Sequence, residues 1–116
     1  MTDRRKDNAL NIEVRNEPEN RQFTVEVDGR VAGKAEYRLR GETYLFIHTE
    51  VDPEFQGLGV ANRLAHSALD DVRSQGRTLV ALCPFIAAYI KRHPEYDEIV
   101  DQEMTDSFKR RRDAKQ

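Results

Sequence analysis

Residues 44–74 read YLFIHTEVDPEFQGLGVANRLAHSALDDVRS, and the hydrophobic pattern changes within this stretch. Residues 44–51 predict a β-strand whose side chains alternate between two faces. From about residue 59 to 74, apolar residues recur at steps of three and four, which predicts an amphipathic helix: Ala61, Leu64, Ala65, Ala68, Leu69 and Val72. A loop with two glycines connects the strand to the helix, and this unit anchors the interpretation of the whole chain.

Three further strands are predicted before this unit, at residues 11–15, 23–27 and 31–39. Asp28–Gly29 is a strong hairpin signal, because a type I′ turn needs a positive φ at both central residues. Gly33 lies inside the third strand and indicates a bulge or a close backbone approach. The four strands therefore predict an antiparallel meander.

After the helix, residues 78–82 form a short apolar run that predicts a strand covered on both faces. Pro84 suits the first turn of a second helix, residues 84–92, which His93–Pro94 ends. A strand, a helix and a further strand in this order allow a right-handed crossover between parallel strands. We therefore predict an α+β fold with a mixed sheet and the order β-β-β-β-α-β-α.

The chain has 116 residues, which suits one domain, predicted at residues 10–100 between a flexible N-terminal tail (1–9) and a charged C-terminal tail (101–116). The formal net charge of −2 does not favour a nucleic-acid partner. Cys83 is the single cysteine, which suits a reducing compartment, and no apolar run approaches a membrane span. We expect a cytoplasmic protein without a membrane partner.

The loop DPEFQGLGVA, residues 52–61, enters a helix N-terminus, which attracts anions such as phosphate. A Walker loop needs G-x-x-x-x-G-K-[ST], which the chain lacks. A Rossmann fingerprint needs a third glycine where Asn62 stands. A glycine-rich turn that serves only tight packing is a further alternative. A third nucleotide-loop pattern, Q/R-x-x-G-x-G/A, is satisfied at every fixed position by Gln56, Gly59 and Ala61.

This motif and its flanking sequences, HTEVDPEFQGLGVANRLAHSALD and LCPFIAAYIKRHPEY, resemble the small stand-alone members of the GNAT acyltransferase superfamily. The resemblance spans about residues 23–100. It implies acetyl-CoA as donor substrate, an amine on a small molecule or protein as acceptor, and a monomer or weak homodimer. It implies that the coenzyme binds to Val51, Gln56, Gly57, Leu58, Gly59, Val60 and Ala61. The helices that the superfamily usually has between its first two strands are missing.

Acyl transfer to an amine requires a base for the amine proton and a donor that polarises the thioester carbonyl. Alternation along residues 44–51 predicts that Tyr44, Phe46, His48 and Glu50 share one face, which places two ionisable groups beside the loop. By resemblance, Glu50 is the favoured base and His48 the next candidate. Both could equally be ordinary solvent-facing strand residues.

Two further residues are catalytic candidates. By resemblance, Tyr89 matches a tyrosine near the coenzyme sulfur that acts as general acid, although it also suits a buried helix stripe. Cys83 lies at the end of the last strand and the start of the last helix, where a thiolate is stabilised, so it is a candidate acyl acceptor. A buried, inert cysteine is the alternative. Asn62, Arg63, Lys91 and Arg92 are weak candidates for the coenzyme's ribose phosphate, and no metal site is predicted.

The sequence thus predicts an N-acetyltransferase that uses acetyl-CoA and an unidentified amine. Two alternatives stay open. One is an acyl-CoA-binding module without turnover, suggested by the missing acceptor-side helices. The other is acyl or thiol chemistry at Cys83.

Overall fold

The computed structural model describes residues 11–114, with side chains to residue 111, so the predicted N-terminal tail at 1–9 lies outside the described residues. The strands are β1 (Ile12–Glu17), β2 (Gln22–Val27), β3 (Arg30–Arg40), β4 (Thr43–Val51) and β5 (Thr78–Ala81). The helices are α2 (Val60–Ser74), α3 (Pro84–Arg92) and α4 (Gln102–Ala114). Short 3-10 helices are η1 (Pro18–Asn20), η2 (Pro53–Phe55) and η3 (Pro94–Ile99).

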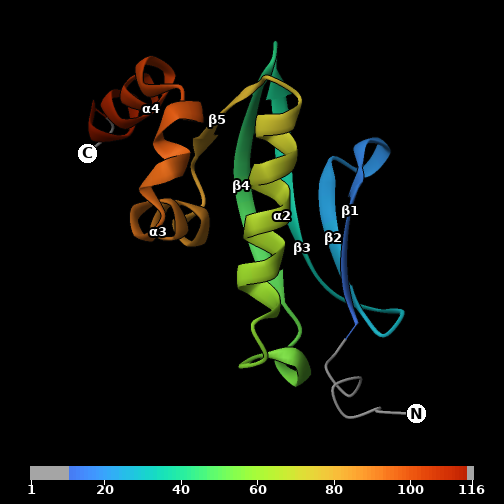
Figure 1. The fold of residues 1–116 in the computed structure, drawn as a ribbon. Coiled ribbons are helices and arrows are strands. Elements are labelled where there is room, and N and C mark those ends of the chain that lie inside the picture. The colour runs from blue at the N-terminus through green and yellow to red at the C-terminus, as the bar shows by residue number, and fades with distance from the viewer. Residues whose placement is uncertain (1–10, 115–116) are drawn as a thin grey trace.

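The five strands form one sheet in the order β1-β2-β3-β4-β5 (Figure 1). The first four strands pair antiparallel and β5 pairs parallel with β4, which confirms the predicted mixed sheet and element order. Only η1 separates β1 from β2, as predicted. Asp28 and Gly29 have φ values of 49° and 84°, so the predicted hairpin turn has positive φ at both central residues.

Both features expected at Gly33 are present. The β2–β3 register shifts between Val25 and Glu26, so Ala32 is an extra residue on β3. A Cβ added to Gly33 would lie 2.4 Å from the Glu50 carbonyl oxygen, a distance that real Cβ atoms essentially never show. Glycine at this position therefore lets β3 lie tightly against the end of β4.

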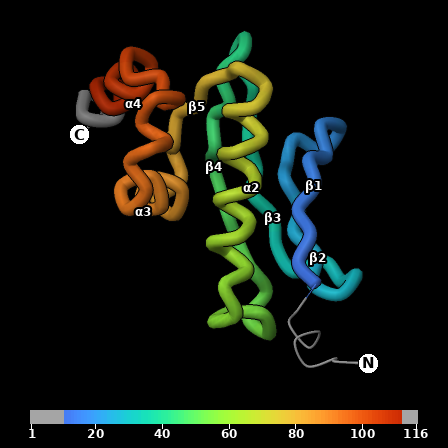
Figure 2. Tube along the Cα trace, in the orientation of Figure 1, coloured from blue at the N-terminus to red at the C-terminus, as the bar shows by residue number. Residues whose placement is uncertain are grey.

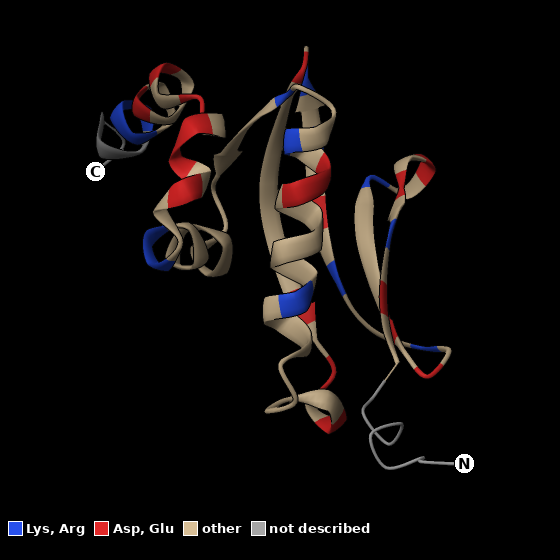
Figure 3. Cartoon of the chain, viewed as in Figure 1, with Lys and Arg blue, Asp and Glu red and all other residues tan. Residues whose placement is uncertain are grey.

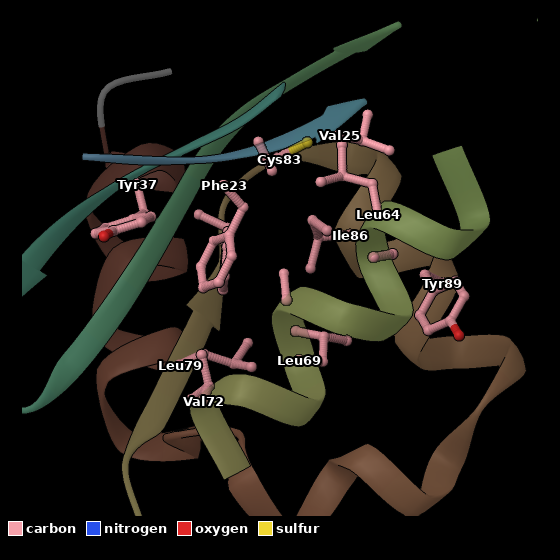
Figure 4. Close-up of a cluster of buried hydrophobic side chains, with 14 of the residues drawn as sticks. Phe23, Val25, Tyr37, Leu64, Leu69, Val72, Leu79, Cys83, Ile86 and Tyr89 are labelled. Atoms are coloured by element: carbon pink, nitrogen blue, oxygen red, sulfur yellow. The ribbon is translucent and has the colours of Figure 1, made fainter. Parts of the chain in front are cut away.

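Helix α2 lies alongside the strands against the sheet (Figures 1 and 2). Its apolar stripe belongs to the buried core. The stripe is buried as predicted from Leu64 to Val72, but Val60 takes the first buried position and Ala61 is only partly buried. Four sheet aromatics, Phe23, Tyr37, Tyr44 and Phe46, pack together with ring centroids 4.6–6.2 Å apart. Figure 4 shows Phe23 and Tyr37 in the cluster that includes Leu69 and Val72 of α2.

Residues 102–114 form helix α4, which corrects the prediction of a charged tail from residue 101. Asp101 caps the helix, because its Oδ1 accepts a hydrogen bond of 2.9 Å from the Met104 N–H. The Asp101 N–H donates to the Leu79 carbonyl over 2.8 Å, which attaches the start of α4 to β5. Acidic residues near its N-terminus and basic ones near its C-terminus match the helix dipole (Figure 3).

A second bulge corrects the predicted faces of β4. Glu36 pairs with His48 but Tyr37 pairs with Phe46, so Ile47 is an extra residue on β4. Directly paired residues share a face and neighbours alternate, so His48 lies on the face opposite Phe46. His48 and Glu50 therefore point to the outer face of the sheet, while Thr49 points to the α2 side. Strict alternation, which placed Tyr44, Phe46, His48 and Glu50 together, was wrong beyond Ile47.

Candidate functional site

The loop after β4 is braced by the β2–β3 hairpin. The Asp52 N–H donates to the Ala32 carbonyl over 2.8 Å, and Phe55 is buried at the end of η2. The Arg30 guanidinium lies 5.1 Å from the centre of the Phe55 ring and forms an ion pair of 2.6 Å with Glu54. These contacts fix the point from which the glycine loop starts.

The two glycines shape the loop itself. Gly57 and Gly59 have φ values of 83° and 78°, a left-handed conformation that strongly favours glycine. A Cβ on either residue would meet no protein atom within 4 Å, so the backbone there faces open space. The Gln56 side chain turns back and donates from Nε2 to the Val51 carbonyl over 3.3 Å. A ligand can therefore approach the loop backbone closely.

The N-terminus of α2 presents unpaired backbone donors to the same space. The first α-helical hydrogen bond runs from the Arg63 N–H to the Gly59 carbonyl over 3.1 Å. Consequently, the N–H groups of Val60, Ala61 and Asn62 have no acceptor within the helix. No side chain caps Gly59. Three free N–H groups and the positive end of the helix dipole create a site that favours an anion such as a phosphate.

A cleft of about 690 Å³ opens in front of these donors. It forms where β5 leaves β4: their pairing ends at Phe46 and Ala81, and the Leu82 and Cys83 N–H groups both donate to the Phe46 carbonyl. The cleft is lined by residues of β4, the loop, α2 and α3: Thr49, Glu50, Val51, Phe55, Gln56, Gly57, Gly59, Val60, Ala61, Asn62 and Phe85.

The structure brings nearly all predicted loop residues into this cleft. Leu58 is the exception, because it does not line the cleft and 48% of its surface is exposed to solvent. The sequence analysis missed Thr49, Phe55 and Phe85, of which Phe85 comes from α3 far along the chain. Thr49 lies between His48 and Glu50, the two predicted base candidates, so its position in the sequence was a signal that it belongs to the site. Phe85 had no such local signal.

Glu50 and His48 lie together, and Glu50 lines the cleft. The His48 Nε2 is 2.9 Å from the Glu50 Oε1, and more than half of each side chain is exposed. Lys34 and Glu36 form a neighbouring ion pair of 2.8 Å on the same outer face. The hydrogen bond from Lys34 lowers the pKa of the Glu36 carboxyl. The arrangement gives the cleft a carboxylate–imidazole pair that can accept a proton.

Cys83 and Tyr89 lie outside the cleft lining. Cys83 is buried at the N-cap of α3, with its Sγ 3.3 Å from the Thr49 Oγ1. Tyr89 is buried, and its ring stacks on His93 with centroids 4.2 Å apart. Figure 4 shows the Tyr89 hydroxyl pointing away from Cys83. Burial raises the pKa of the Tyr89 phenol, which therefore stays protonated.

A shallow hollow on the exposed side of α2 is lined by Arg63, His66, Ser67, Asp70, Asp71 and Ser74. Arg63 thus faces this hollow, while Lys91 and Arg92 are exposed at the end of α3. Between residues 11 and 114, no helix has the length and apolar character that a membrane crossing requires. In the same part of the chain, no group of three His, Cys, Asp or Glu side chains is arranged to hold a metal ion.

Comparison with known proteins gives the family of the chain. The model of the GCN5-related N-acetyl-transferase family matches residues 22–99. Protein NATD1 of Xenopus tropicalis is 33% identical over 91 residues, covering 76% of this chain and 83% of that protein. Protein NATD1 of Homo sapiens is 33% identical over 85 residues, covering 72% and 75%.

A solution NMR structure of a GCN5-like protein from Staphylococcus aureus has the same fold, with a TM-score of 0.58 at 20% identity. The match covers 79% of this chain and 88% of that one. The family model, the NATD1 relatives and the shared fold confirm the resemblance seen in the sequence. The chain therefore belongs to the GCN5-related N-acetyltransferase family, a family of acyltransferases.

Proposed function

We propose that this protein binds acetyl-CoA in the cleft and transfers the acetyl group to an amine. The observation that carries the proposal is the set of free N–H groups at the N-terminus of α2, which open onto the cleft beside two left-handed glycines. This arrangement suits the pyrophosphate of coenzyme A. The predicted coenzyme residues Val51, Gln56, Gly57, Gly59, Val60 and Ala61 all line the same space.

The open edge of β4 gives the acyl end of the donor a place to lie. Among residues 11–114, β4 pairs beyond Phe46 only with β3, so its backbone edge toward α3 is unpaired except at the Val51 carbonyl, which accepts from Gln56. An extended amide-containing chain can hydrogen-bond to such an edge. With the pyrophosphate at the loop, the chain of the donor would run along this edge toward Thr49 and Phe85.

The amine would reach the thioester from the outer face of the sheet, where His48 and Glu50 point. Its nitrogen attacks the carbonyl carbon, a C–N bond forms and the C–S bond breaks. The amine proton passes to the His48–Glu50 pair, and the departing thiolate takes a proton from solvent in the open cleft. The role of Tyr89 as the acid stays a prediction, because its buried hydroxyl is not among the cleft-lining groups.

Two measurements test this proposal. Titration calorimetry of the purified protein should show binding of acetyl-CoA and of CoA, whereas no heat at millimolar ligand would refute the site. Mass spectrometry after incubation with acetyl-CoA and a panel of monoamines, polyamines and lysine peptides should then detect an acetylated product. Binding without any product would instead support the second candidate described next.

The second candidate is an acyl-CoA-binding module without turnover. The observation that favours it is the three-residue η1, which alone connects β1 and β2 where the wider superfamily usually has helices. Without such helices, the acceptor side has fewer groups within residues 11–114 to hold a second substrate. Glu50→Gln distinguishes the two candidates. If the protein is an acetyltransferase, the variant should lose turnover. Under either candidate, its affinity for acetyl-CoA should be unchanged.

A further inference from the structure

Thr49 is a cleft-lining residue with a hydroxyl group, and it lies where the acyl group of the proposed donor would lie. The bulge at Ile47 turns Thr49 toward the α2 side, opposite to His48 and Glu50. Thr49 lines the cleft together with Glu50 and Val51 of the same strand and Phe85 of α3. Without the bulge, strict alternation would send this hydroxyl to the outer face.

The hydroxyl of Thr49 has a single protein partner among the described side chains. The Cys83 thiol donates to the Thr49 Oγ1 over 3.3 Å. A threonine hydroxyl has one proton to donate and two lone pairs that accept, so this contact occupies one lone pair and leaves the proton free. A partly buried hydroxyl normally finds an acceptor for that proton. The cleft is where such an acceptor would lie.

Cys83 is held firmly enough to orient this hydroxyl. Its N–H donates to the Phe46 carbonyl over 2.9 Å, and its carbonyl accepts from the Ala87 N–H over 3.1 Å. The side chain is 3% exposed, within the cluster shared by α2, α3 and the sheet. The thiol therefore approaches Thr49 from the protein interior. Its hydrogen bond directs the hydroxyl proton away from the core.

We infer that Thr49 donates a hydrogen bond to the thioester carbonyl oxygen of the bound acyl donor, and that Cys83 is the residue that positions it. The inference rests on the proposed function. When the amine attacks, the carbonyl oxygen gains negative charge and the hydrogen bond from Thr49 strengthens. When the C–S bond breaks, the oxygen becomes the carbonyl of the amide product. Cys83 keeps its proton throughout and forms no bond to the acyl group.

Kinetics of matched variants test both roles. Removal of one such donor typically lowers kcat by about 10²–10³-fold, so Thr49→Val should lose at least about 10²-fold in kcat with an unchanged Kd for CoA. Thr49→Ser keeps the hydroxyl and should stay within about tenfold of wild type. Thr43→Val is the control. Thr43 lies in the same strand, and its Oγ1 is 2.9 Å from the Thr78 Oγ1, at a place that is not part of the cleft lining. The kcat of this variant should not change.

Cys83 variants separate positioning from covalent catalysis. Cys83→Ala should lower kcat by less than Thr49→Val does, and Cys83→Ser, which retains a donor, should recover part of the loss. Wild-type protein incubated with acetyl-CoA should carry no acetyl group on Cys83 by mass spectrometry. An acetyl-Cys83 adduct, together with a Cys83→Ala loss larger than that of Thr49→Val, would overturn the inference and support the covalent role.

An infrared measurement tests the hydrogen bond without any amine. Acetyl-CoA labelled with ¹³C at the carbonyl is bound to wild type and to Thr49→Val, and its carbonyl stretch is compared. The inference predicts a lower frequency in wild type, because the donated hydrogen bond weakens the C=O bond. If wild type and Thr49→Val both bind the ligand and show equal frequencies, the role of Thr49 is overturned, but the proposed function is not. Absence of binding to wild type would overturn the proposed function as well.

Discussion

The two halves of β4 have opposite properties although they belong to one nine-residue strand. Residues 43–46 pair with β3 on one side and β5 on the other, and all four side chains are buried. Within the described part of the chain, residues 47–51 pair only with β3, none of their side chains is fully buried, and three of them line the cleft. One half holds the fold together, and the other half presents groups to the cleft.

Two local events create this difference. The extra residue Ile47 exchanges the faces of the strand, so that Thr49 rather than His48 points to the α2 side. At the same point, β5 ends and the chain turns into α3 at Cys83, which opens the edge of β4. The strand thus passes from a buried half to a cleft-lining half within two residues, where its register with β3 also shifts by one residue.

The largest effect on stability is expected from Phe46→Ala. Phe46 is fully buried in the aromatic cluster, and removal of a core phenylalanine typically costs about 3–5 kcal/mol. Urea denaturation should show this loss in the free energy of unfolding. Ile47→Ala, one residue further on, removes a side chain that is only partly buried and should cost clearly less. Equal losses in the free energy of unfolding for the two variants would contradict the boundary that we place at Ile47 between the two halves of β4.

A smaller effect is expected from Gly59→Ala. A non-glycine residue in the left-handed region costs about 1–2 kcal/mol, and Gly59 has a φ of 78° at the loop. Gly41→Ala is the matched control, because Gly41 has a φ of 62° in the turn before the buried half and also has free space for a Cβ. Both variants should lose similar stability, but only Gly59→Ala should weaken CoA binding, by at least tenfold in calorimetry.

Alkaline pH should weaken the buried half through Tyr37, which pairs with Phe46. Burial raises the pKa of the Tyr37 phenol above its ordinary value of 10.0. Above pH 10 the unfolded chain loses this proton while the folded protein keeps it, so the free energy of unfolding falls as pH rises. Below pH 10 the contribution is fully present. Tyr37→Phe should show a smaller loss between pH 10 and 11 in urea denaturation.

The smallest effect on stability is expected from His48→Ala and Glu50→Gln. Both side chains are more than half exposed, and exposed substitutions usually change stability by less than about 0.5 kcal/mol. Their effect on kcat should nevertheless be large, about 10²–10⁴-fold, if the pair acts as the general base. A measured stability loss as large as that of Gly59→Ala would mean that this half also supports the fold.

The sequence predicted the elements that local signals define. Asp28–Gly29 set the first hairpin, and the helical apolar spacing after Gly59 set α2. Pro84 and His93–Pro94 marked both ends of α3, and the paired glycines indicated a ligand-binding loop where the cleft lies. Each of these features depends on the backbone preferences of a few neighbouring residues, which the sequence states directly.

The features that the sequence did not predict depend on distant contacts or on weak signals. The bulge at Ile47 has no glycine or proline to mark it, so alternation was extended past it. The contact between Thr49 and Cys83 joins residues from two elements that only the crossover brings together. Helix α4 has a weak apolar pattern, and its start depends on Asp101, whose capping role was not recognised in a stretch dominated by charge.

The most direct test is a two-dimensional ¹H–¹⁵N spectrum of the labelled protein, recorded during a titration with CoA. We predict the largest shifts for the amides of the loop and the first turn of α2, residues 57–62, followed by residues 47–51 of β4. Residues 43–46 should change little. Shifts concentrated in residues 43–46, or at the shallow hollow on α2 with residues 57–62 unchanged, would contradict the division of β4 into a structural half and a ligand-binding half.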